Sequence, residues 1–121
     1  MEGHRDLLVW QKSMALVQNV YRTTKVFPAD EQYGLTSQFR RCAISVPSNI
    51  AEGHGRASKK EFRKFIVQAR GSLVEMETQL EIARDLHYLS PKSAQDLILQ
   101  ANEIGRMLNG LKSWCESRAG S

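Results

Sequence analysis

The residues best suited to binding chemistry form a basic cluster in residues 56–64. Cations at the start of a helix oppose the positive end of its dipole, so a sequence shaped only by stability would place acids there. A phosphate group would meet both the cations and the free backbone amides of such a helix end. The segment therefore predicts a nucleic-acid-binding surface, made by Arg56, Lys59, Lys60, Arg63 and Lys64, with Arg40 and Arg41 as candidate additions.

A second explanation of the same cluster stays open. The cations also suit a solvated face, or a contact with acids of a neighbouring subunit such as Glu75, Glu77 and Glu81. The chain lacks the interleaved aromatics on which bases stack, so only phosphate contacts are predicted. Two function classes follow. One is a nucleic-acid-binding protein, with RNA favoured over DNA, and the other is a structural or protein-interaction oligomer with no nucleic-acid role.

Patterns typical of catalysis or metal binding are missing from the sequence. None of the three histidines stands three residues after a glutamate, as a di-iron site in a helical bundle needs. The two cysteines are expected to be free thiols, and no histidine shares the face of Cys42 to activate it. We therefore expect no enzyme, no catalytic residue, no metal, no cofactor and no small-molecule substrate.

A polar turn is predicted around Pro47, Asn49, Glu52 and Gly53. Proline inside a helical pattern removes a backbone donor, so a kink or an early helix end is expected near Val46. Asn49 and Glu52 are interpreted as a local cap network that fixes the turn, and a polar site at a subunit interface is the alternative. The stretch Gly53-His54-Gly55 is expected to form the C-terminal turn of the helix, where glycine fits the left-handed region.

Four segments carry apolar residues at the three- and four-residue spacing of amphipathic helices. They cover residues 7–27, 31–52, 58–86 and 91–114. Asp6, Ser58 with Glu61, and Ser90 before Pro91 are predicted to begin helices, and Pro28 to end one. The predicted fold is a single all-α domain over residues 1–121, an antiparallel up-down-up-down four-helix bundle with a long third helix and a frayed tail at 116–121.

Charge and composition narrow the class of protein. The net charge is +4, but residues 1–70 hold 12 basic and 6 acidic residues, and residues 71–121 hold 5 and 7. The longest stretch without a charged residue, 42–51, is far shorter than the about 20 residues that a membrane span needs. Two cysteines are too few for a disulfide scaffold. We therefore expect a cytoplasmic protein with no membrane partner.

Several motifs together resemble one family. They are Asp6–Lys12, Tyr33–Arg41, Ser45–Gly53, Ser58–Phe62 and Gly71–Leu80, and the stretch from Pro47 to Gly53 is the most specific. They are similar to the bacterial four-helix bundle proteins encoded in intervening sequences of 23S ribosomal RNA genes. The resemblance implies a homo-oligomer, expected to be a five-fold ring, and brings no catalytic motif. The architecture is also similar to the nucleic-acid-binding rings of diversity-generating retroelements, an analogy of fold alone.

The apolar pattern independently favours assembly. The first and third segments carry apolar residues on more than one narrow stripe. Tyr21, Phe27, Tyr33 and Phe62 supply more aromatic surface than the ends of a small monomeric bundle need. Because large exposed apolar patches usually mark interfaces, these aromatics are predicted to lie at contacts between copies of the chain.

Overall fold

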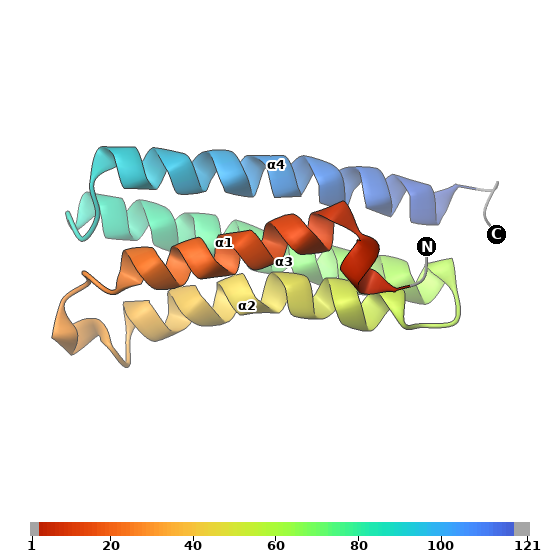
Figure 1. The fold of residues 1–121 in the computed structure, drawn as a ribbon, viewed down its shortest axis with the longest axis horizontal. Coiled ribbons are helices and arrows are strands. Elements are labelled where there is room, and N and C mark those ends of the chain that lie inside the picture. Colours follow the sequence, from red (N-terminus) through yellow and green to blue (C-terminus); the bar gives the residue numbers. More distant parts are fainter. Residues whose placement is uncertain (1–2, 118–121) are drawn as a thin grey trace.

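The computed structural model describes residues 3–117, which form an antiparallel up-down-up-down bundle of four helices (Figure 1). Each helix packs on its neighbours in the chain, and α1 also packs on α4, which closes the bundle. Residues 3–117 contain no strand, and α3 is 27 residues long, so the predicted all-α fold with a long third helix is confirmed. The helices are α1 (Leu8–Thr24), α2 (Leu35–His54), α3 (Lys59–Asp85) and α4 (Pro91–Glu116), with short 3-10 helices η1 (His4–Asp6) and η2 (Ala29–Glu31).

One apolar row from each helix fills the core. The largest fully buried side chains come from all four helices and include Leu16, Phe39, Ile66 and Leu108. Two polar side chains of α1 are buried with them, and each hydroxyl donates to a carbonyl one turn earlier in the same helix, as Ser13 does to Val9 at 2.7 Å. Each hydroxyl thus has a partner within α1, and the Thr24 hydroxyl also accepts a hydrogen bond from Arg40 of α2.

The ends of α1 differ from the prediction. Asp6 lies in η1 and does not cap α1, whose N-cap is Leu7 with no side-chain hydrogen bond. At the other end α1 stops at Thr24, four residues before Pro28, which precedes η2. The expected cap at Asp6 and the expected stop at Pro28 are therefore wrong.

Glu31 fixes the connection between α1 and α2. Its carboxylate accepts hydrogen bonds from the Leu35 amide at 3.1 Å and from the Tyr88 hydroxyl at 2.7 Å. The hydrogen bond from Tyr88 and then that from Leu35 lower the pKa of Glu31 below its ordinary value. The carboxylate joins the start of α2 to the α3–α4 connection. The helix α2 begins at Leu35 and not at residue 31, where the sequence predicts its start.

The helix α2 does not end at Val46. It runs through Pro47, which is buried, and continues to His54. Proline cannot donate to the carbonyl four residues earlier, so one helical hydrogen bond is missing there. The packing of α2 against α1 and α3 keeps the helix intact, and the predicted early end is wrong.

Gly53 is needed for close packing. The helix ends within the expected stretch, with Gly55 as its C-cap, but the expected left-handed conformation is wrong. No glycine in residues 3–117 has a positive φ, and Gly53 lies inside α2. A Cβ atom at this position would lie 2.5 Å from Phe65 Cβ and 2.9 Å from Phe62 Cδ1. Only glycine lets the end of α2 approach the start of α3 this closely.

The remaining helix ends follow the sequence more closely. The Ser58 hydroxyl accepts the Glu61 amide at 3.1 Å, and the Ser90 hydroxyl accepts the Ser93 amide at 3.1 Å, which confirms both predicted caps. The frayed tail is predicted to start at residue 116, but Glu116 is still helical. Residues 118–121 of that tail lie outside the described residues.

A histidine closes α3 in a conformation that usually belongs to glycine. His87 has a φ of 62°, its amide donates to the Arg84 carbonyl, and the Tyr88 amide donates to the Ala83 carbonyl at 2.9 Å. This is the Schellman pattern, in which the left-handed residue follows the C-cap. The sequence alone indicates only a surface position for His87.

The role of Gly53 predicts that Gly53→Ala destabilises the protein. Overpacking costs about 1–3 kcal/mol, and it outweighs the gain of about 1 kcal/mol from replacing a helical glycine by alanine. Gly71→Ala is the matched control, since a Cβ there meets nothing within 4 Å. Urea unfolding at one protein concentration measures both. Equal stabilisation by the two substitutions would contradict the packing role.

The conformation of His87 predicts that His87→Gly stabilises the protein. A left-handed backbone costs a residue with a side chain about 1–2 kcal/mol, and glycine escapes this cost. Thermal unfolding should therefore shift upward for His87→Gly and not for His87→Ala. An equal melting temperature for the two variants would show that backbone strain at this position is negligible.

Candidate functional site

The predicted basic cluster lies at the end of the bundle where α3 begins and α4 ends. Lys59, Lys60 and Arg63 line an open hollow of about 500 Å³ together with Cys115 and Glu116 of α4. The Lys59 ammonium lies 3.3 Å from the Ser117 carbonyl oxygen and 4.2 Å from the centre of the Trp114 ring. The negative end of the α4 dipole thus offsets the unfavourable placement of cations at the start of α3.

Most cations of this basic end are paired within the chain. Arg63 and Lys112 both bind Glu116, which lowers the pKa of that carboxyl. The other two pairs are Arg56 with Glu52 at 2.9 Å and Lys64 with Glu61 at 3.1 Å. Exposed ion pairs of this kind contribute little energy, so phosphate groups can compete for these cations.

The basic end nevertheless keeps a positive excess. Counting Lys112, six cations face the three carboxylates of Glu52, Glu61 and Glu116. Lys60 is exposed and forms no ion pair or hydrogen bond with the described part of the chain. The end can therefore attract an anion, and Lys60 is its most available cation.

Arg40 and Arg41 do not join the basic end. Arg40 stands fourteen residues before the end of α2 at His54, which places it about 21 Å away along the helix. Its guanidinium donates to the Thr24 hydroxyl at 2.8 Å and lies 4.4 Å from the centre of the Tyr21 ring, so it ties α2 to α1. Arg41 is exposed on the next position of α2, and it too lies far from the basic end.

The residues of the predicted polar turn separate into two unrelated contacts. The Asn49 amide donates to the Ser45 carbonyl at 2.9 Å and to the Ser45 hydroxyl, which contacts the Ser72 hydroxyl at 2.8 Å. Asn49 thus helps join α2 to α3, and Glu52 instead pairs with Arg56. The interpretation as one local cap network is wrong, because the two side chains serve different contacts.

An apolar groove between α1 and α2 is the main surface feature that sequence reasoning did not locate. It is lined by Trp10, Met14 and Val17 of α1 and by Ile44, Pro47 and Ala51 of α2, with His4 and Ser48 at its edges, and it holds about 330 Å³. The signal was present, because α1 carries a second apolar row one residue after each position of its core row. Trp10 and Val17 of this second row pack only partly against the core, and Met14 stays exposed.

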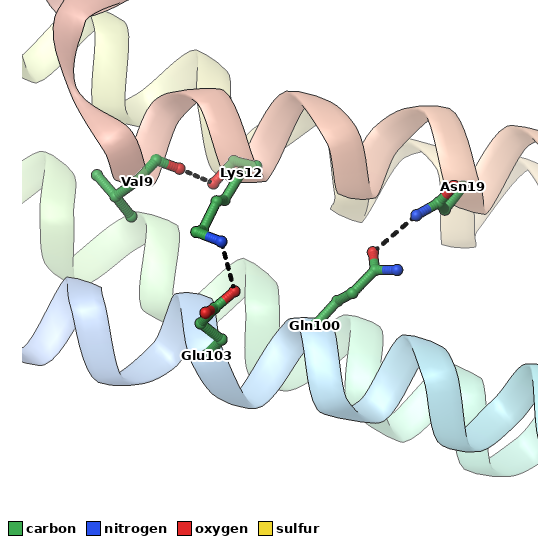
Figure 2. A network of polar contacts seen from close by, with 6 residues as sticks. Val9, Lys12, Asn19, Gln100 and Glu103 are labelled. Atoms are coloured by element: carbon green, nitrogen blue, oxygen red, sulfur yellow. Dashed lines mark hydrogen bonds and ion pairs between the residues drawn. The ribbon is translucent and has the colours of Figure 1, made fainter.

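The two flanks of α1 differ in chemistry. Toward α4, polar pairs seal the surface: Lys12 binds Glu103 at 3.0 Å and Asn19 donates to Gln100 at 3.0 Å (Figure 2). Toward α2, the Met14 side chain remains 37% exposed and Ile44 40% exposed. Exposed apolar surface of this kind is typical of contacts between proteins.

The aromatics predicted to lie at subunit contacts fall into two groups. Phe27 and Phe62 are buried in the core, so assigning them to an interface is wrong. Tyr33 is 91% exposed in the α1–α2 connection, and Tyr21 is partly covered by Arg40. The number of aromatic residues could not separate these cases, because burial depends on whether each ring faces the core or the solvent.

The described residues offer little for catalysis. Both cysteines are buried free thiols, and burial raises the pKa of each. His4 contacts Trp10, His54 contacts Phe62, and His87 closes α3, so the imidazoles lie at separate places. Within residues 3–117 no three Cys, His, Asp or Glu side chains gather in a way that could hold a metal ion. No helix of that range is both long and apolar enough to cross a membrane.

Comparisons with known proteins agree with this architecture. A crystal structure of a protein of unknown function from the S23 ribosomal protein family of Bacteroides thetaiotaomicron superimposes with a TM-score of 0.80. It is 21% identical to this chain, and the alignment covers 87% of this chain and 98% of that one. No curated protein matches the sequence. The profile of the family described as 23S rRNA-intervening sequence protein matches residues 5–110, and the chain therefore belongs to that family.

Proposed function

We propose that the chain is a non-enzymatic helical-bundle protein that assembles with copies of itself through the α1–α2 groove. The observation that carries this proposal is the apolar groove, in which Met14 and Ile44 remain exposed and Trp10 and Val17 are only partly buried against the core. Removing apolar surface from water contributes about 25 cal/mol per Å². Aromatic residues and methionine are also the types enriched at interfaces.

A second copy is the occupant that needs no further component. Symmetric homo-oligomers are the commonest assemblies of soluble proteins. In a dimer the groove meets the same groove of the partner, whereas in a ring it meets a different surface of the next copy. The five-fold ring that the family resemblance implies belongs to the second kind, so the measured mass distinguishes the two arrangements.

The groove predicts that Met14→Glu with Ile44→Glu breaks the assembly. Two carboxylates placed in a dehydrated interface without partners would oppose association. Light scattering coupled to size exclusion should give the variant the monomer mass of 13.7 kDa with unchanged helical circular dichroism. Val26→Glu with Leu99→Glu is the control, because these side chains are also exposed but lie outside the groove. Loss of mass in both variants, or in neither, would contradict the assignment.

Binding of nucleic-acid phosphates at the basic end is a second candidate function. The excess of six cations over three carboxylates favours it, together with the unpaired Lys60. Assembly would bring several basic ends into one particle and strengthen their common potential. The contacts would go to phosphates, so RNA and DNA are both candidate ligands, with RNA favoured.

The basic end predicts a change in the salt dependence of binding. Replacing Lys59, Lys60, Arg63 and Lys64 with alanine should reduce the slope of log K against log salt by about 0.7–0.9 for each phosphate that the variant no longer neutralises. Fluorescence anisotropy with labelled structured RNA and duplex DNA measures the slope. An unchanged slope would remove the cluster from the binding surface. If the variant instead loses assembly and the unmodified protein binds neither nucleic acid, the cluster is a contact between subunits.

A further inference from the structure

The outer face between α3 and α4 carries a second set of donors that lies away from the basic end and from the groove. Leu73 of α3 packs against Gly105 of α4, and the small glycine leaves a hollow of about 270 Å³ above this contact. Arg70 of α3 and Asn102, Arg106 and Asn109 of α4 line it. Four side chains rich in N–H donors therefore border one small hollow.

Unlike most cations of the basic end, the two arginines are unpaired within the described residues. Neither Arg70 nor Arg106 forms a hydrogen bond or an ion pair with any residue between Gly3 and Ser117, and the same holds for Asn109. Each guanidinium presents five N–H donors in a planar fork that matches the oxygens of a phosphate group. Two such forks beside an unbonded amide are suited to an anion.

The one carboxylate at this hollow lies at its far end. Glu77 follows Arg70 by seven residues, about 10 Å along α3, and it pairs with neither arginine. Burial and the neighbouring Glu81 raise the pKa of Glu77. An anion at the end occupied by Arg70 and Asn109 would avoid this charge.

We propose that the hollow binds a backbone phosphate of a nucleic-acid strand, held by Arg70 and Arg106 with Asn109 as a further donor. Pockets that enclose a small molecule hold about 300–1,000 Å³. This hollow is smaller, so it admits one phosphate group and leaves the rest of the ligand outside. A polymer that makes its other contacts elsewhere fits that requirement better than a free nucleotide does.

The hollow also continues the basic end. Arg70 follows Arg63 by two turns of α3, about 10 Å, and Arg106 precedes Lys112 by about 9 Å along α4. A strand bound at the basic end can thus run along the α3–α4 face, in place of the path over α2 that Arg40 and Arg41 suggested. The inference rests on the second candidate function, nucleic-acid binding.

The test compares Arg70→Gln with Arg106→Gln against a control pair that removes the same charge. Lys25→Gln with Lys92→Gln is suitable, because both lysines are exposed at the opposite end of the bundle and form no ion pair or hydrogen bond with described residues. In an anisotropy titration with single-stranded RNA, the arginine pair should lower the salt slope by about 0.7, the value for one phosphate contact, and weaken binding roughly tenfold at physiological salt. The control pair should change neither.

The outcomes separate the two claims. If the unmodified protein binds RNA with a steep slope and the arginine and lysine pairs behave alike, the hollow is not part of the strand's path and the basic end stands alone. If the unmodified protein shows no salt-dependent binding, both claims fail. A titration with inorganic phosphate, followed by the NMR signals of the Arg70 and Arg106 Nε–H groups, adds the last arm. Saturation by phosphate that RNA does not reverse would identify a free-anion site and overturn the assignment.

Discussion

The close approach of α2 and α3 at Gly53 is the constraint on which the rest of the structure depends. The missing side chain lets Phe62 and Phe65 pack directly against the end of α2, and the chain then reverses within residues 55–58. This contact sets where α3 begins, and therefore which end of α4 meets the first turn of α3. The positions of Lys59, Lys60 and Arg63 beside the C-terminus of α4 follow from it.

The contact between the start of α3 and the end of α4 changes how the basic cluster in the sequence is interpreted. Cations at the start of α3 oppose their own helix dipole, but the C-terminal carbonyls of α4 and Glu116 compensate. Part of the cluster therefore has a structural role, and a ligand has to compete with these internal contacts for the paired cations. The guanidiniums of Arg70 and Arg106 on the α3–α4 face, unpaired within residues 3–117, carry no such internal role.

The amino-acid sequence predicts the helices well and the sites less well. Apolar spacing and the local signals at Ser58 and Ser90 identify the four helices, because these features act within one turn of the chain. The pairing of Arg63 with Glu116 joins residues that are 53 positions apart, so no local pattern shows it. The role of Gly53 cannot be predicted from the sequence for the same reason, because it depends on which α3 residues pack against Gly53. The distance of Arg40 from the basic end, by contrast, follows from the rise of a helix alone.

Self-assembly through the α1–α2 groove is the central claim about function. The groove exists because α1 has two apolar rows and only one core to fill, and because α4 covers the other flank with polar pairs. Sedimentation equilibrium of the unmodified protein over a range of micromolar concentrations tests the claim most directly. The account predicts a mass at least twice the monomer mass of 13.7 kDa. A mass that stays at 13.7 kDa over the whole range would contradict it.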